Sequence, residues 1–211
     1  MSAVHSEQVS MLEGHAHSGR SPEWWGMVFF IASEALIFAN FIAAFLYLEI
    51  RGLQIPGGSW VLPSGEHLPV LFPAINTIFL LGSSIPARIA GAAAARGDRK
   101  RLIIGLLCTV ILGAIFIGGQ AFEYYSLYSE GFNLGYKTFG SAFFLLTGFH
   151  GLHVTVGLIF LIICLIRAIR GDFSKTKHFA VEAGEMYWHF VDGVWIFVFS
   201  TVYLLPFLLP H

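Results

Sequence analysis

The chain is unusually apolar for its length. It has 211 residues, of which 56% are hydrophobic and 12% are charged, whereas an ordinary soluble domain is roughly 45–50% apolar and about 25% charged. This composition excludes a water-soluble fold. Twelve Lys and Arg against 13 Asp and Glu give a formal net charge of -1, which provides no basic surface for a phosphate backbone and excludes nucleic acid as a partner.

Residues 1–23 form a polar tail that precedes the first apolar run. The tail contains His5, His15 and His17, which lack cysteine or acidic partners at ligand spacing. We therefore expect a solvated arm and not a metal site. The tail also lacks the basic-then-apolar pattern of a cleaved signal peptide. The remaining residues, 24–211, are predicted to form one transmembrane domain.

Five apolar runs follow, and each is long enough to cross a bilayer as an α-helix. A spanning helix needs about 17–25 mostly apolar residues. The predicted spans cover residues 24–50, 70–95, 102–127, 139–166 and 187–209. The segments between them are short and rich in Gly, Pro, Ser or charged residues. We predict an all-α membrane protein with five transmembrane helices.

The distribution of Lys and Arg predicts the orientation of these helices. With a cytoplasmic N-terminus, ten basic residues lie on the cytoplasmic side and only Arg51 and Lys137 lie outside. The ten are Arg20, Arg88, Arg96, Arg99, Lys100, Arg101, Arg167, Arg170, Lys175 and Lys177. Because cytoplasmic loops carry an excess of Lys and Arg, the N-terminus is predicted to be cytoplasmic and the C-terminus to lie outside.

The second predicted helix carries small residues at every fourth position in two adjacent rows. The rows are Ser83, Ala87, Gly91 and Ala95, and Gly82, Pro86, Ala90 and Ala94. Small side chains allow another helix to approach closely within a membrane. We expect dense helix packing at these rows and not the lining of a substrate path.

Glu34 is the acidic residue that lies deepest in the first predicted helix. It is ten residues from the start of that helix, which at 1.5 Å per residue is roughly 15 Å and close to the bilayer midplane. An ionisable group in hydrocarbon is costly unless it is neutral, paired or hydrated. Two roles stay open: a carboxyl group that carries protons, or a neutral acid that donates a hydrogen bond to a neighbouring helix or lipid headgroup.

His150 and His153 are three residues apart and share one face of the fourth predicted helix. They supply only two ligand nitrogens, and His189 is the one further histidine in the predicted spans. A haem or metal centre built from these three histidines is the alternative. We expect instead that the pair bonds to backbone carbonyls or carboxylates.

The last predicted helix begins with His189 and Asp192, which are also three residues apart. We expect them to pair with each other or with a preceding acidic turn that contains Glu182 and Glu185. Glu123 lies near the outer end of the third predicted helix, and we interpret it as an interfacial carboxylate that anchors a loop.

The segment QAFEYYSLY predicts the partners of Glu123, because it places Gln120 and Tyr124 close enough to bond its carboxylate. Cys108 and Cys164 both lie in apolar runs, where cysteine behaves as a small buried hydrophobe. The residues alone give no nucleophile with a base, no phosphate-binding glycine loop and no CxxC motif. They predict a membrane-embedded packing subunit with one midplane glutamate.

Five segments of the chain together resemble a known family. They are GMVFFIASEALIF, PAINTIFLLGSS, QAFEYY, GYKTFGSAFFLLTGFHGLHVTVGL and HFAVEAGEMYWHFVDGVWIFVF. In this order, in or beside all five predicted helices, they resemble subunit III of the haem–copper terminal oxidases. The resemblance is to the short, five-helix bacterial form, which lacks the two extra N-terminal helices of the longer form.

This resemblance implies an accessory core subunit that binds no metal and stabilises the catalytic subunit I of a proton-pumping oxygen reductase. Haem and copper are then held by the partners, which are subunit I as the main contact, subunit II and further small subunits. Glu34 matches the carbodiimide-reactive carboxyl of the family, whose subunit III supports proton uptake and sustained turnover. Bound phospholipid and a multi-pass location in the bacterial cytoplasmic membrane are also implied.

Two alternative functions remain open. Related short chains serve quinol oxidases, but the SEA triplet, QAFEY and EAGEMYWHF look more like the cytochrome c type. An independent proton-coupled transporter would use the same buried ionisable residues. The odd number of predicted helices argues against the paired repeats of many secondary transporters.

Overall fold

The structure is a computed structural model that describes residues 21–53, 62–63 and 68–208. Its helices are α2 (Pro22–Leu53), α3 (Leu71–Arg96), α4 (Arg99–Ser129), α5 (Lys137–Arg170), α6 (Phe179–Phe199), the π-helical segment η1 (Ser200–Leu204) and α7 (Leu205–Leu208). The described residues contain no β-strand, and the all-α prediction is confirmed for them. Residues 1–20, with the three histidines of the predicted tail, lie outside the described part of the chain.

The chain divides within α2 into two compact units, Met1–Glu34 and Ala35–His211. The described part of the first unit is the beginning of α2. The carbonyl of Ser21 there accepts hydrogen bonds from the backbone N–H groups of Trp24 and Trp25, whose rings pack edge to face at 5.1 Å. These bonds satisfy two of the N–H groups that a helix start leaves without an intrahelical partner.

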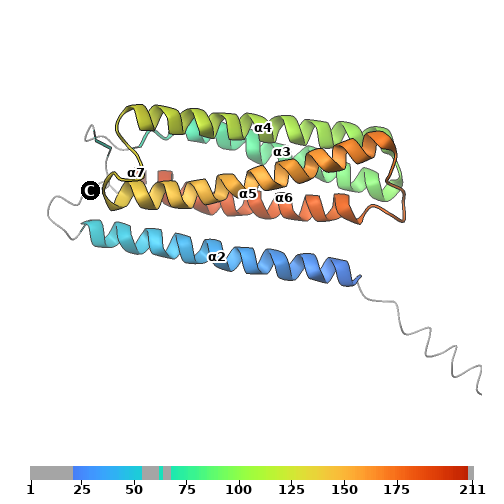
Figure 1. Cartoon of the computed structure of the whole chain (residues 1–211), viewed down its shortest axis with the longest axis horizontal. Helices are drawn as coiled ribbons and strands as arrows, with labels where there is room; N and C mark the ends of the chain where they lie inside the picture. Colours follow the sequence, from blue (N-terminus) through green and yellow to red (C-terminus); the bar gives the residue numbers. More distant parts are fainter. Residues whose placement is uncertain (1–20, 54–61, 64–67, 209–211) are drawn as a thin grey trace, which may run out of the picture. The chain divides into compact units, whose positions relative to one another are not determined.

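The second unit is a bundle in which α3, α4, α5 and α6 lie side by side along their lengths (Figure 1). Helix α3 contacts α4 and α6, and α5 contacts the same two helices. The core is largely aromatic and includes Phe116, Phe143, Trp188 and Trp195, each almost completely buried. Residues 35–53 of α2 join this unit through Phe38, whose ring packs against aromatic side chains of α5 and α6.

Four of the five long helices have the length and composition of membrane spans: α2 as far as Gly52, α3, α4 and α5. Their bounds extend each predicted span by only a few residues or match it closely. Large apolar side chains such as Ile78, Ile85 and Phe122 are exposed on their surfaces, as expected where hydrocarbon replaces water as the solvent. The chain is therefore a multi-pass membrane protein.

Helix α6 differs from the predicted last span. It begins at Phe179 and not at residue 187, so the acidic turn expected at Glu182 and Glu185 is wrong, because both residues lie inside the helix. Buried side chains continue on one face of α6 back to Val181, and this packing extends the helix beyond its most apolar part. With Asp192 the helix holds three acidic residues, and it is not among the four apolar spans.

A short turn rich in charged residues connects α3 to α4, as expected for a segment between two predicted spans. Gly97 ends α3 in the left-handed conformation with φ 74°, which glycine adopts at little cost. Asp98 then caps α4, because its carboxylate accepts the backbone N–H of Arg101 at 3.1 Å. The two helices consequently run back along each other.

The small residues of α3 pack densely, as predicted, against two different helices. A methyl group added at Gly105 of α4 would lie 2.8 Å from the carbonyl oxygen of Pro86 and 3.0 Å from Cβ of Ala90. On α6, the carboxylate of Glu185 lies directly over Gly91. The rows therefore bring both α4 and α6 close to the backbone of α3.

Candidate functional site

Polar side chains between α3 and α6 form the most connected group in the described part of the bundle. Two indoles of α6 donate hydrogen bonds to hydroxyl groups of α3: Trp188 Nε1 to Ser83 Oγ and Trp195 Nε1 to Thr77 Oγ1, both at 2.8 Å. The two helices run in opposite directions. Trp195, the later tryptophan of α6, therefore bonds to Thr77, the earlier of the two α3 residues. These contacts fix the register of the two helices.

Ser84 of α3 connects His189 and Asp192 of α6. Its Oγ lies 3.1 Å from His189 Nδ1, and it donates a short hydrogen bond to Asp192 Oδ2. Among the described residues, Asp192 Oδ1 has no hydrogen-bond partner. The histidine and the aspartate do not bond directly to each other, since the serine hydroxyl stands between them.

Glu185 extends this group toward the start of α6. Its Oε1 lies 3.7 Å from His189 Nε2, an ion-pair distance if the imidazole is protonated. The carboxylate fits there because Gly91 of α3 has no side chain. Glu182 is partly buried one turn earlier in α6, and it is not connected to the group by any described hydrogen bond or ion pair.

Glu123 is buried at the opposite end of the bundle, and its bonding differs from the prediction. Tyr203 of η1 donates a hydrogen bond to Glu123 Oε1 at 2.9 Å. The expected bonds from Gln120 and Tyr124 are wrong, because these side chains bond instead to Thr147 of α5, at its carbonyl and its hydroxyl. Glu123 is therefore a helix-to-helix contact inside the bundle, with only 7% of its surface exposed.

His150 and His153 face different surroundings although they share one side of α5. His150 is completely buried, and its ring lies 4.7 Å from the ring of Trp195. Neither of its ring nitrogens has a hydrogen-bond partner among the described residues, so the expectation of a polar contact is wrong for His150. The Nδ1 atom of His153 lies 2.8 Å from the carbonyl oxygen of Phe149, which is the kind of backbone contact expected for it.

The histidines do not converge on a common point. In the described part of the chain, no three His, Cys, Asp or Glu side chains come together as a group that could hold a metal ion. His150 packs among aromatic rings, His153 reaches a backbone carbonyl and His189 reaches Ser84. Each imidazole thus has its own separate neighbours.

Glu34 lies in α2 at the end of the first compact unit. Its side chain is partly buried. One residue before it, the hydroxyl of Ser33 donates a hydrogen bond of 2.7 Å to the carbonyl of Phe30 within the helix. The structure therefore places Glu34 on a regular helix, away from either helix end.

An apolar cleft of about 580 Å³ lies between residues 35–46 of α2 and α6. From α2 it is lined by small and aliphatic side chains, including Ala35, Ala39 and Ala43. Gly193 and Phe197 contribute from α6. His189 is the only polar residue described in the lining, so the cleft suits apolar ligand groups.

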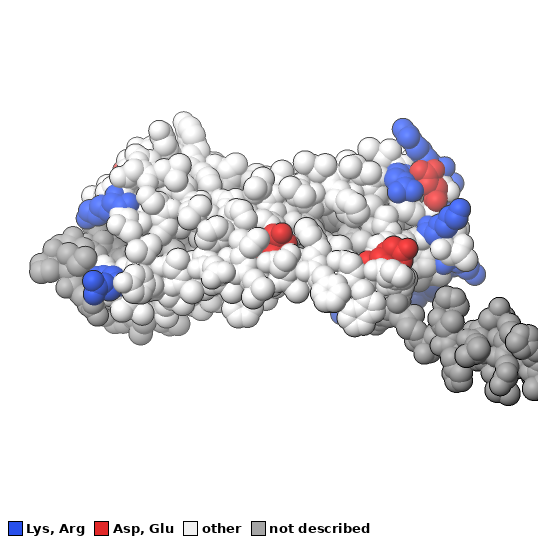
Figure 2. Space-filling view, turned by 60° about the horizontal axis from the view of Figure 1, so that its bottom comes forward, with Lys and Arg blue, Asp and Glu red and all other residues white. Residues whose placement is uncertain are grey.

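Basic residues gather where the α3–α4 turn meets the loop between α5 and α6. We call this the basic end, and its residues are Arg96, Arg99, Lys100, Arg101, Arg167, Arg170, Lys175 and Lys177. Figure 2 shows Lys and Arg side chains gathered toward the two ends of the face in view. This distribution of Lys and Arg matches a membrane protein whose basic groups lie in the two headgroup regions.

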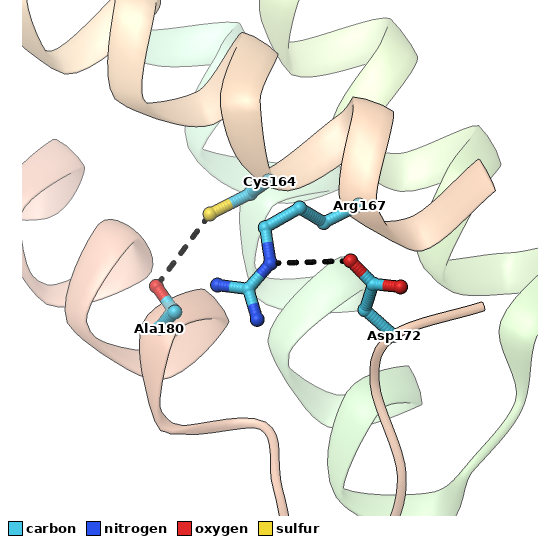
Figure 3. A network of polar contacts seen from close by, with 4 residues as sticks. All are labelled: Cys164, Arg167, Asp172 and Ala180. Atoms are coloured by element: carbon cyan, nitrogen blue, oxygen red, sulfur yellow. Dashed lines mark hydrogen bonds and ion pairs between the residues drawn. The ribbon is translucent and has the colours of Figure 1, made fainter. Parts of the chain in front are cut away.

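Two polar contacts hold the basic end together, as Figure 3 shows. Cys164 donates a weak S–H bond to the carbonyl of Ala180, which joins α5 to the start of α6. Arg167 Nε lies 3.5 Å from Asp172 Oδ2. The free thiol therefore has a packing role there, consistent with the prediction that Cys164 is a buried hydrophobe.

Sequence reasoning missed Ser84 and Tyr203, which belong to these groups, and one further buried acid in α2. Ser84 lies next to the small-residue rows of α3 but belongs to neither, and Tyr203 looks like an ordinary aromatic residue in an apolar run. Glu49 was also missed, although it is 4% exposed and its Oε2 has no partner among the described residues. Ser84 could be found from the sequence only by noting that it lies opposite Asp192 when α3 and α6 pack antiparallel. That requires knowing which residues of the two helices lie side by side, and the sequence does not give this register.

Comparison with known proteins identifies related chains. The family model described as cytochrome c oxidase subunit III matches residues 5–206. The cytochrome c oxidase subunit 3 of Osphranter robustus is 41% identical over 181 residues, which are 85% of this chain and 68% of the relative. Those of Bos taurus and Drosophila melanogaster are each 40% identical over 181 residues, with the same coverage of both chains.

Proposed function

Because the chain belongs to the cytochrome c oxidase subunit III family, we propose that it is an accessory, non-catalytic core subunit of a haem–copper oxygen reductase. The observation that carries this proposal is the family match over residues 5–206. The proposed role is to stabilise subunit I and to support proton uptake and sustained turnover. The oxidase reduces oxygen to water and pumps protons in aerobic respiration.

The proposed partners are subunit I as the main contact, subunit II and further small subunits, together with membrane lipids. The broad exposed apolar surfaces of α3, α4 and α5 support this proposal, because such surfaces pack equally well against lipid chains or other membrane helices. Haem and copper are proposed to lie in the partner subunits. The separate neighbours of His150, His153 and His189 support that assignment.

We propose five spans, with α6, η1 and α7 together forming the fifth. The lengthwise packing of α6 against α3 and α5 supports this proposal (Figure 1). The basic end is proposed to face the cytoplasm, which places the N-terminus inside and the C-terminus outside. The proposed location is the bacterial cytoplasmic membrane, since the sequence resembles the short form of the family.

Glu34 is the residue proposed to support proton uptake. The family resemblance of its segment and its place in the middle of an apolar helix support this role. The cleft between α2 and α6 is proposed to hold acyl chains of a bound phospholipid. Its volume and its almost entirely apolar lining support that proposal.

The proposed electron donor of the complex is cytochrome c and not a quinol. The relatives are subunits of cytochrome c oxidases, which supports this choice. Oxidation of reduced cytochrome c by the purified complex tests it. Oxidation of quinol but not of cytochrome c would replace this donor with the alternative.

Gentle extraction of the chain from its native membrane tests the central proposal. We expect it to co-purify with partners that show the visible absorption of haem. A colourless, isolated chain that conducts ions after reconstitution would instead establish an independent transporter.

A Glu34→Gln variant of the intact complex tests the proton role. We expect slower proton uptake and earlier loss of activity during turnover, whereas Glu23→Gln, an exposed position at the start of the same helix, should leave both unchanged. Unchanged proton uptake and unchanged endurance in Glu34→Gln would limit this residue to a packing role.

A further inference from the structure

Four polar side chains between α3 and α6 are all groups that can carry a proton, which helix packing alone does not require. They follow one another as proton-carrying groups: a carboxyl, an imidazole, a hydroxyl and a second carboxyl. We propose that Glu185, His189, Ser84 and Asp192 form a proton relay between α3 and α6. The use of the relay in an oxidase rests on the proposed function. The proton transfer itself involves only side chains of this chain.

The distances give the relay its order. Glu185 Oε1 lies 3.7 Å from His189 Nε2, and His189 Nδ1 lies 3.1 Å from Ser84 Oγ. Ser84 then donates a short hydrogen bond to Asp192 Oδ2. The first gap exceeds a hydrogen bond, so transfer there requires a small rotation of the Glu185 side chain, which lies over Gly91 without a blocking methyl group.

Burial gives the relay an outer and an inner end. The side chains of Glu185 and His189 are 25% and 34% exposed, whereas Asp192 is 4% exposed. Glu185, which lies nearest the start of α6, is therefore the end at which protons enter, and the buried carboxyl of Asp192 has almost no exposed surface for direct exchange. Asp192 Oδ1 is buried without a partner among the described residues, which disfavours a permanent negative charge and favours a carboxyl that accepts a proton.

The side chains described beside the relay are largely apolar. His189 is the only polar residue described in the lining of the α2–α6 cleft, where Phe190, Gly193 and Val194 lie beside it. Arg88 is one turn beyond Ser84 on α3, but its side chain is exposed and forms no described contact with the group. The side chains themselves are therefore the polar route to Asp192.

One transfer moves a single proton and leaves the electron count unchanged. The proton of the Glu185 carboxyl passes to His189 Nε2, while Nδ1 releases its proton to Ser84 Oγ. The serine hydroxyl releases its original proton to Asp192 Oδ2. Glu185 ends as a carboxylate, Asp192 ends as a carboxylic acid, and His189 remains neutral in its other tautomer.

Infrared spectroscopy of the full chain in lipid membranes tests the relay directly. A protonated aspartic acid has a carboxylic C=O band, which shifts when its proton is replaced by deuterium. We expect Asp192→Asn to remove one such band and Ser84→Ala to shift it, because the carboxyl loses a hydrogen bond. An unchanged band pattern in Asp192→Asn would overturn the proposal.

The rate of deuterium exchange at the Asp192 carboxyl tests the route. Placing the membranes in heavy water should shift the band quickly in the unmodified chain. His189→Gln and Glu185→Gln keep the volume of each side chain but interrupt proton transfer, so we expect each to slow the shift by about 10²-fold or more. Glu182→Gln, one turn earlier on α6, should leave the rate unchanged.

Unaltered exchange in both His189→Gln and Glu185→Gln would show that protons reach Asp192 by another path and would overturn the relay. Fluorescence of the buried Trp188 and Trp195 checks that each variant retains the native bundle. The measurement needs neither haem partners nor turnover. A failed relay is therefore distinguishable from failure of the proposed function, which shows itself in the absence of co-purifying haem.

Discussion

Tyr203 donates a hydrogen bond to Glu123 at 2.9 Å and thereby joins the π-helical segment η1 to α4. Both side chains are buried, at 2% and 7% exposure. The ring of Tyr203 also stacks on Phe199 at 5.5 Å and meets Phe143 of α5 edge to face at 6.0 Å. The bond and the ring contacts together hold the end of the last helix against the bundle.

Removal of the tyrosine hydroxyl should leave a buried carboxyl without its partner. We expect Tyr203→Phe to lower the free energy of unfolding by about 1–3 kcal/mol, the cost of an unsatisfied buried polar group. Equilibrium unfolding in mixed micelles, followed by tryptophan fluorescence, measures this loss. Tyr125→Phe is the control, because that ring is 75% exposed. Equal stability of the two variants would show that the bond contributes nothing.

Substitution by alanine should have opposite effects at two glycines of α4, Gly113 and Gly118. A Cβ atom at Gly113 would lie 2.8 Å from Cη2 of Trp188 and 3.2 Å from Cδ1 of Leu158. Trp188 cannot easily move, because it is fully buried and hydrogen-bonded to Ser83. We expect Gly113→Ala to cost about 1–3 kcal/mol of stability through overpacking.

Gly118 is the matched control on the same helix. A Cβ atom there meets nothing within 4 Å, so Gly118→Ala should be neutral or stabilising by up to about 1 kcal/mol through the better helix propensity of alanine. Thermal unfolding of both variants, measured by circular dichroism in the same lipid, gives the comparison. A Gly113→Ala protein as stable as Gly118→Ala would contradict the close contact of the Trp188 ring with Gly113 of α4.

Arg99 at the start of α4 caps the end of α5. Its Nε donates to the carbonyl of Ala168 at 3.1 Å, and its Nη2 donates to the carbonyl of Ile169. These bonds satisfy two of the carbonyls that a helix end leaves open and place a cation at the negative end of the helix dipole. We expect Arg99→Met to cost about 1 kcal/mol and to increase hydrogen exchange in the last turn of α5.

Lys100→Met removes an adjacent cation without a described bond to α5 and should leave that exchange unchanged. Hydrogen exchange followed by mass spectrometry of peptides from this turn measures both variants. Equal protection in the two proteins would show that the cap does not stabilise the helix end.

Hydropathy predicted the helices well where both the lipid-facing side and the protein-facing side of a helix consist of apolar residues. For α3, α4 and α5 the bounds shifted by only a few positions, because both the exposed and the buried faces of these helices are largely apolar. The start of α6 could not be found in this way. Its first turns contain Glu182 and Glu185, and contacts with neighbouring helices, not hydrocarbon, keep them helical.

The sequence by itself determined that this chain enters a membrane, which runs become helices and that its buried acids and histidines need partners, because composition and helical spacing are local properties. Only the tertiary structure decided who those partners are. Ser84 meets His189 and Asp192, and Tyr203 meets Glu123, across more than 80 intervening positions in most cases. Such pairings depend on the register of packed helices, which no local pattern of residues specifies.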